Sequence, residues 1–144
     1  MVQIITDSSS LYTGEEGNKL GIISIPLCIT IGKRNFRDLE IPTEEFVSEI
    51  QTGLIPVSSQ PPIVDVLEAY EKSQGRKIIN ISLADGLSGT YQTACTAREM
   101  AKNRDDITVL NTKTLCGPHR YLVECAAAMA KEGKGETEIL QMLN

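Results

Sequence analysis

The sequence predicts an α/β fold in which a mainly parallel sheet carries helices on both faces. Four short apolar runs rich in β-branched residues, at 2–5, 22–31, 78–82 and 107–110, have the character of buried strands. Segments with apolar residues at helical spacing separate most of these runs. Strands that alternate with helices form parallel sheets, which are buried between two helical layers. The length of 144 residues is that of a single domain.

The first half of the chain alternates apolar runs with polar turns. The apolar run at 2–5 ends where the polar residues 6–10 begin, so a loop is expected there. Thr43 is expected to cap a helix that Gly53 ends. The expected elements, in order, are strands at 2–5 and 22–31, a short return strand at 35–37, a helix from 43 to 53, a turn-rich loop at 56–62 and a helix from 63 to about 75.

The second half of the chain alternates strands and helices more regularly. A small-residue loop at 84–89 separates a strong strand pattern from a helix of good helix formers. An alanine-rich helix ends at Gly133, which is placed for a left-handed cap. The expected elements, in order, are a strand at 78–82, a helix at 90–102, a strand at 107–110 and helices at 120–132 and 136–144.

Composition and charge exclude several classes of protein. Hydrophobic residues make up 41% and charged residues 23%, as in a folded chain, so disorder is excluded. The formal net charge of -5 argues against a nucleic-acid-binding surface, which is basic. The longest apolar stretch, 20–31, contains Pro26 and is shorter than the roughly 20 apolar residues that span a bilayer, so stable membrane insertion is not expected.

The cysteines and the start of the chain favour a cytoplasmic location. No basic segment precedes the first strand, so no signal peptide is predicted, and the four cysteines are expected to be free thiols. Cys116 and His119 could share a metal, but no second compact ligand pair exists, so no zinc site is predicted. A lone histidine beside a helix start is more often a cap or a surface residue.

The loop between the strand at 78–82 and the next helix is the most informative segment. Gly86 and Gly89 permit close approach of the backbone, and Ser88 and Thr90 add hydroxyl donors. The helix start behind them presents unpaired N–H groups and a positive dipole end, so the segment suits a carboxylate or a phosphate. The alternative is a tight turn in which Ser88 or Thr90 only caps the helix.

Two other polar segments could face the same crevice. Ser58, Ser59 and Gln60 stand just before a helix and could form a second wall of donors, or they could simply precede a helix that begins with proline. Asp7 and Ser8 follow the first strand and could line the crevice, or they could form an Asx turn. Ligands in parallel sheets bind at the carboxyl ends of the strands, where both the first loop and the 84–89 loop should lie.

The residues alone leave an enzyme and a phosphate-binding module open as alternatives. The sequence lacks the ending of a Walker loop and the three glycines of a dinucleotide fingerprint. It narrowly misses the G-x-S-x-G elbow, because Gly89 comes one residue too early after Ser88. A serine acyl hydrolase that uses Ser88 would need His119 as its base, since His119 is the only histidine.

Four motifs in order resemble a known family. The chain contains I-I-T-D-S-S-S at its start, then P-L-C-I-T-I-G-K-R-N-F-R-D, S-S-Q-P and A-D-G-L-S-G-T-Y-Q. In this order they resemble the N-terminal domain of the DegV family of fatty-acid-binding proteins. The similarity covers essentially all 144 residues and includes N-T-K-T-L-C-G near residue 111. The resemblance implies a DegV-like N-terminal α/β domain at residues 1–144, with the family's second domain absent.

The resemblance also implies a function. It implies a lipid-binding protein, not an enzyme, that holds one long-chain fatty acid such as palmitate and needs no cofactor. It implies a partner, a dihydroxyacetone-kinase-like fatty acid kinase that phosphorylates the bound carboxylate. The carboxylate donors of the family map to Ser58, where threonine is common, and to Ser88. The supporting loop residues would be Asp7, Ser8, Ser59, Gln60, Gly86, Leu87, Gly89 and Thr90.

Overall fold

The protein is built on a four-stranded parallel sheet, as the sequence predicts. The computed structural model describes residues 1–143. The sheet has the order β2-β1-β6-β7, and every neighbouring pair is parallel. Its strands are β1 (Val2–Asp7), β2 (Ile22–Ile25), β6 (Lys77–Ser82) and β7 (Ile107–Asn111). Ile4 of β1 pairs with Ile22 on one side and Ile79 on the other.

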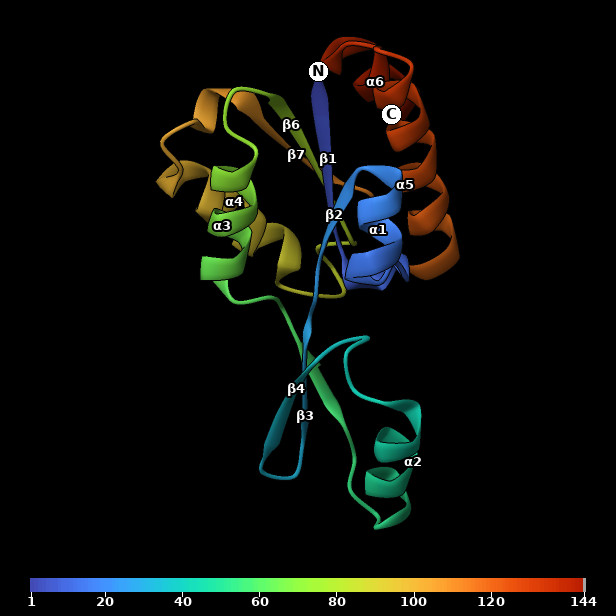
Figure 1. The fold of residues 1–144 in the computed structure, drawn as a ribbon. Helices are drawn as coiled ribbons and strands as arrows, with labels where there is room; N and C mark the ends of the chain where they lie inside the picture. The colour runs from blue at the N-terminus through green and yellow to red at the C-terminus, as the bar shows by residue number, and fades with distance from the viewer. Residues whose placement is uncertain (144) are drawn as a thin grey trace.

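Helices cover both faces of this sheet, which confirms the predicted layers (Figure 1). On one face lie α3 (Ile63–Lys72) and α4 (Thr90–Met100). On the other lie α1 (Gly14–Leu20), α5 (Cys116–Lys131) and α6 (Glu136–Leu143). Two apolar clusters fill the spaces between the layers, one with α3 and α4 and one with α5 and α6. None of the described helices is long and apolar enough to cross a membrane.

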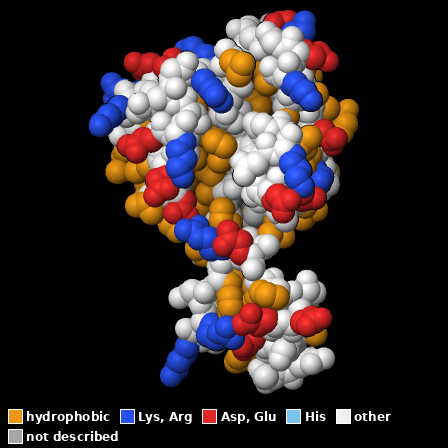
Figure 2. Space-filling view, in the orientation of Figure 1, with side chains coloured by type: hydrophobic (Ala, Val, Ile, Leu, Met, Phe, Trp, Pro, Cys, Tyr) orange, Lys and Arg blue, Asp and Glu red, His pale blue; other side chains and the backbone are white. Residues whose placement is uncertain are grey.

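The chain leaves this body between β2 and α3 and forms a separate lobe, here called the arm (residues 26–62). The arm contains β3 (Cys28–Ile31), β4 (Arg34–Arg37), α2 (Thr43–Gln51) and β5 (Val57–Ser59). Its strands form an antiparallel sheet in the order β4-β3-β5. Figures 1 and 2 show the arm projecting from the body beyond a narrow waist. Contacts at its base include the Arg37–Asp65 ion pair and a 2.7 Å hydrogen bond from Ser8 Oγ to Asp38 Oδ2.

The arm is where the sequence-based prediction departs most from the structure. The apolar run at 22–31 was predicted as one strand, but it breaks at Pro26 into β2 and β3, which belong to different sheets. Pro26 has no N–H for a ladder, and the N–H of Leu27 donates to Ser8 Oγ instead, at 3.0 Å. The predicted loop at 56–62 contains strand β5, which pairs with β3.

Several helix boundaries also differ from prediction. Helix α1 was not predicted. Thr13 and Glu16 form a capping box at its start. The predicted cap Thr43 is wrong: it is the first residue of α2, and Pro42 precedes it without a capping bond. Helix α5 starts at Cys116, four residues before the predicted start, because Pro118 is tolerated in a first turn. Helix α4 ends at Met100 instead of 102. The last predicted helix includes Asn144, which lies outside the described residues.

Tyr70 anchors α3 to the sheet through a buried hydroxyl. The side chain has no exposed surface. Its hydroxyl donates to the Ala94 carbonyl at 3.2 Å and accepts from Asn80 Nδ2 at 2.8 Å. Burial raises the pKa of Tyr70 far above its usual value, and the hydrogen bond from Asn80 lowers it only in part. The folded protein therefore holds this proton more tightly than the unfolded chain does.

We expect Tyr70 to make the free energy of unfolding fall at alkaline pH. The contribution is fully present below about pH 10, the unfolded pKa, and is lost as the pH rises above it, by up to about 1.4 kcal/mol per pH unit. Tyr70→Phe should flatten this decline in urea unfolding between pH 9 and 11, although it costs about 1–3 kcal/mol at neutral pH by leaving Asn80 Nδ2 without its acceptor. Tyr121→Phe, at a side chain 66% exposed, should keep most of the slope. Equal slopes for wild type and Tyr70→Phe would contradict this reading.

Candidate functional site

The topology places a crevice at the carboxyl ends of β1 and β6. In the sheet, β2 lies next to β1 on one side, and β6, the next strand of this sheet along the chain, lies next to β1 on the other side. Such a reversal of strand order is where open α/β sheets bind ligands. Two segments leave the strands there: the short 3-10 helix η1 (Ser8–Ser10) after β1, and the loop at 83–89 after β6.

Asp7 links these two segments through hydrogen bonds of its carboxylate. Its carboxylate is buried. One oxygen, Oδ2, accepts the N–H of Leu83 at 3.0 Å, and the other, Oδ1, accepts the N–H and the hydroxyl of Ser9 at 3.0 and 2.5 Å. Ser8 is likewise bonded internally, to Asp38 and to the Leu27 N–H. The polar groups of Asp7 and Ser8 therefore hold the crevice in shape.

His119 belongs to the same internal frame, so the expectation of a surface or cap residue was wrong. It has no exposed surface. Its Nε2 lies 3.1 Å from Thr6 Oγ1 and 3.1 Å from the Ile81 carbonyl, and its Nδ1 lies 3.0 Å from Ser9 Oγ. Helix α5 carries it there because the helix begins earlier than predicted. Both ring nitrogens are occupied, so His119 does not serve as a base for Ser88.

The structure shows no metal centre in the part that it describes. Cys116 is exposed while His119 is buried, so the two side chains face different environments. Within residues 1–143, no group of three or more His, Cys, Asp and Glu side chains is placed to hold a metal ion.

Ser88 lies at the start of α4 and is hydrogen-bonded to Thr90. Its Oγ accepts the N–H of Thr90 at 3.2 Å and lies 2.9 Å from Thr90 Oγ1. Thr90 is buried, and we assign its hydroxyl proton to this bond because a buried hydroxyl needs an acceptor. The proton of the half-buried Ser88 then remains for an acceptor outside the loop. No acidic residue lies in the first turn of α4, so nothing there opposes an anion at the helix start.

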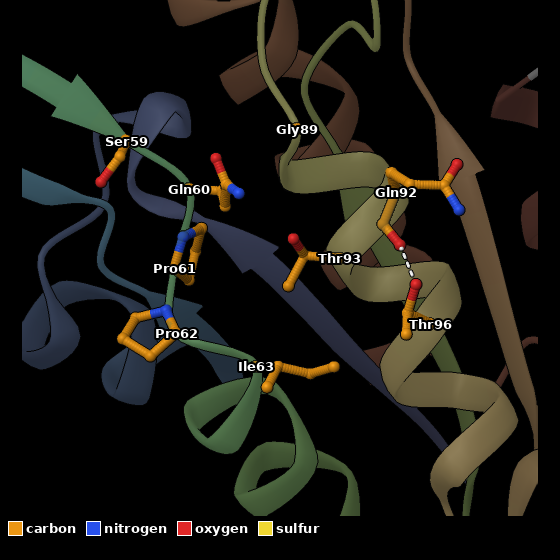
Figure 3. A pocket seen from close by; sticks show the side chains of 9 residues that line it. All are labelled: Ser59, Gln60, Pro61, Pro62, Ile63, Gly89, Gln92, Thr93 and Thr96. Atoms are coloured by element: carbon orange, nitrogen blue, oxygen red, sulfur yellow. Dashed lines mark hydrogen bonds between the residues drawn. The ribbon is translucent and has the colours of Figure 1, made fainter.

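The arm approaches this loop closely where Gln60 lies against Gly89. A Cβ atom added to Gly89 would lie 3.1 Å from Gln60 Oε1 and 3.2 Å from Gln60 Cδ, so a larger residue would require the Gln60 amide to shift by a few tenths of an ångström. Figure 3 shows the Gln60 side chain between the arm and the start of α4. A cavity of about 550 Å³ opens here, lined by Ser59, Gln60, Pro61, Pro62, Ile63, Gly89, Gln92, Thr93 and Thr96.

The two serines expected to bind a carboxylate lie close to this contact in the sequence. Ser58 lies two residues before Gln60, and Ser88 lies one residue before Gly89. Ser58 pairs with Ile29 in the arm sheet, so its side chain lies on the Ile29 face and that of Ser59 on the other. Among the described residues, the exposed Ser58 hydroxyl has no hydrogen-bond partner. Neither Ser58 nor Ser88 is among the residues that line the cavity.

Sequence analysis missed the residues that α4 contributes to the cavity. Gln92, Thr93 and Thr96 lie on one side of the helix, where Thr96 Oγ1 donates to the Gln92 carbonyl at 2.9 Å (Figure 3). Polar residues at this helical spacing, directly after the glycine-containing loop, were the signal available in the sequence. Gly86 and Leu87 remain exposed in the loop.

Comparisons with known proteins identify the family of the chain. The family model described as "Uncharacterised protein, DegV family" matches residues 1–144. A DegV domain-containing protein from Staphylococcus aureus is 35% identical over 144 residues, which cover 98% of this chain and 51% of that protein. The chain thus spans about half the length of the curated relatives it matches.

Solved structures share the fold at similar coverage. The structure titled "Fatty Acid Binding of a DegV family Protein from Thermus thermophilus" has a TM-score of 0.86 at 25% identity, over 99% of this chain and 51% of that chain. DegV from Bacillus subtilis, titled a fatty acid binding protein, has a TM-score of 0.86 at 27% identity, over 99% and 52%. With its fold, the order of its loops and a family match over its whole length, the chain belongs to the DegV family.

Proposed function

We propose that this protein binds a long-chain fatty acid and holds the carboxylate where the arm meets the loop before α4. The observation that supports the proposal is the close approach of Gln60 to Gly89, because Gln60 follows Ser58 in the arm and Gly89 follows Ser88 in the loop before α4. Membership of the DegV family supports it, as do the Thermus thermophilus and Bacillus subtilis relatives that are described as binding fatty acids.

The donors at this junction suit a carboxylate that is shielded from water. Burying an unpaired carboxylate costs several kcal/mol, so each oxygen needs hydrogen bonds. Ser88 has a proton to donate, the start of α4 supplies N–H groups, and Ser58 has an unengaged hydroxyl. These groups carry no full positive charge, so an acyl anion would be held by hydrogen bonds and by the helix dipole.

Exposed leucines at the same edge of the sheet suit an acyl tail. Leu11, Leu87 and Leu115 follow β1, β6 and β7 respectively, and each is at least 41% exposed. Leu11 adopts φ 63°, a left-handed conformation that costs a non-glycine residue about 1 kcal/mol and that turns up near binding sites. An acyl chain lying over such side chains would gain about 0.8 kcal/mol per buried methylene, on the order of 10 kcal/mol for sixteen carbons before ordering costs.

We also propose that the protein carries its fatty acid to an enzyme. The protein acts as a cytoplasmic carrier without a catalytic residue of its own. A dihydroxyacetone-kinase-like fatty acid kinase transfers the γ-phosphoryl group of ATP to the bound carboxylate, which gives an acyl phosphate and ADP. Because the curated relatives are about twice as long, further contacts to the fatty acid would come from the part of those proteins that this chain does not span.

We expect Ser88→Ala to weaken palmitate binding about 5- to 150-fold, because removing the hydroxyl leaves a carboxylate oxygen unpaired at a cost of about 1–3 kcal/mol. Ser58→Ala should act in the same direction. The measurement is displacement of a fluorescent fatty acid from the 144-residue chain. Ser48→Ala, on the exposed side of α2, is the matched control and should bind as wild type does. Unchanged affinity in both site variants would place the carboxylate elsewhere.

The affinity should also rise with the length of the tail. If the tail lies on apolar side chains, each two added methylenes from C12 to C16 should tighten binding about 5- to 15-fold. Inorganic phosphate at millimolar concentration should not compete with palmitate. Affinity that is independent of tail length, together with competition by phosphate, would favour the phosphate-binding alternative instead.

The carrier role makes a separate prediction for the kinase reaction. With fatty acid kinase and ATP, ADP should form only when the palmitate-loaded chain is present, and Ser88→Ala should lower the rate. The chain with ATP alone should form no ADP, since it supplies no catalytic group. ADP formation at an equal rate without the chain would remove the carrier role while leaving fatty acid binding untouched.

A further inference from the structure

A second cavity lies at the opposite end of the sheet. All four strands of the body are parallel, so their amino ends gather at the edge away from η1 and the 83–89 loop. There a cavity of about 550 Å³ opens between the start of β1, the end of α1 and the second half of α5. It is lined by Met1, Val2, Gln3, Ile4, Lys19, Leu20, Gly21, Arg76, Glu124, Ala127, Ala128, Ala130 and Lys131.

The floor of this cavity is apolar. Val2, Ile4 and Ala127 are buried parts of the core beneath it, and Leu20 stands half exposed at its side. Alanines at 127, 128 and 130 are short, which leaves the space between α5 and β1 open. The lining thus combines an apolar body with a charged rim.

A buried amide fixes one of the rim cations. Gln3 is 7% exposed, and its Nε2 donates to the Gly21 carbonyl at 2.8 Å and to the Ile4 carbonyl at 3.0 Å. This leaves its Oε1 to accept from Arg76 Nη1 at 2.8 Å. The guanidinium is therefore held at the cavity while its other N–H groups stay available. A pre-positioned guanidinium is well suited to carboxylate or phosphate groups.

The charge at the rim is the opposite of that of the chain as a whole. Lys19, Arg76 and Lys131 line the cavity with a single carboxylate, that of Glu124. Lys19 pairs with Glu15, but within residues 1–143 neither Arg76 nor Lys131 forms an ion pair. The chain has a net charge of -5, so the excess of cations at this rim is opposite in sign to the charge of the whole chain.

We propose that this cavity binds an anionic amphiphile, with one carboxylate or phosphate group at Arg76 and Lys131 and a short alkyl body on the apolar floor. The head group is set by charge complementarity, and the tail by the apolar lining. A cavity of this volume takes a small molecule and not a large polymer. The site shares no lining residue with the cavity at the junction of arm and loop. Ligand binding here can therefore be tested independently of the proposed function.

Binding can be tested by amide NMR on the 144-residue chain with octanoate, octyl phosphate, octanol and octyltrimethylammonium. We expect the two anions to shift the amides of 2–4 and 127–131 in a saturable way. Octanol should bind at least tenfold more weakly, and the cation should produce no saturable shift. The ratio of octanoate to octyl phosphate affinity identifies which head group is preferred. Equal binding of octanol and both anions would overturn the proposal.

Matched variants separate the rim from general charge effects. Arg76→Gln and Lys131→Gln should each weaken binding of the preferred anion about 5- to 20-fold, a range typical of losing one charged hydrogen bond. Arg104→Gln changes the charge equally at the exposed η2 (Arg104–Asp106) and should have no effect. Ala128→Leu, at an exposed helix position, should fill the cavity without unfolding the chain and abolish binding.

Two outcomes with these variants would contradict binding at this cavity. Equal losses in Arg76→Gln and Arg104→Gln, or full binding in Ala128→Leu, would show that the anion does not occupy this cavity. Ser88→Ala should leave these shifts unchanged, because it alters only the opposite end of the sheet. A loss in Ser88→Ala together with shifts confined to 86–90 would assign all binding to the other site and remove this one.

Discussion

The contact of Gln60 with Gly89 is the constraint on which the candidate site depends. The arm is a small lobe whose helix α2 has no buried residue, so its own core does little to fix it. Its position is set by contacts with the body, where Arg37 pairs with Asp65 and Gln60 fits against a residue without a Cβ. This fit brings a strand end of the arm beside a helix start of the body. A larger residue at Gly89 would require the end of the Gln60 side chain to shift by a few tenths of an ångström.

Some polar groups of the crevice are fully hydrogen-bonded within the protein, and others still have hydrogen-bonding capacity. Asp7 and His119 are buried and bonded to Ser9, Leu83 and neighbouring groups, so they make the two loops rigid. Among the buried side-chain polar atoms described, only Asn103 Oδ1 lacks a partner, and it lies away from this edge at the end of α4. Ser58 and Ser88 differ because their hydroxyls still have hydrogen-bonding capacity to offer. A rigid frame with a few free donors is what a site for a single anionic group requires.

The sequence predicted the parallel sheet and its helical layers because strands such as β6, with Ile78, Ile79 and Ile81, are rich in β-branched apolar residues and alternate with helical patterns. It also pointed to the loop before α4, where glycines and hydroxyls stand together. It missed α1, since Gly14 and Gly17 weaken the helical pattern; the second glycine is there because a Cβ would lie 2.9 Å from the Ile22 carbonyl. The split at Pro26 and the burial of His119 depend on partners far away in the sequence. Such long-range partners leave no periodic signal.

The two ends of the sheet differ in chemistry. The carboxyl edge offers neutral donors beside exposed leucines, and the amino edge offers cations around an apolar cavity.

The central claim is that a fatty acid carboxylate binds at the carboxyl edge, and a crystal structure of the 144-residue chain grown with palmitate tests it most directly. The account predicts a carboxylate about 3 Å from both the Ser58 and Ser88 hydroxyls, with Gln60 still packed on Gly89. A carboxylate bound away from both serines, or an arm displaced from the loop with palmitate bound elsewhere, would contradict it.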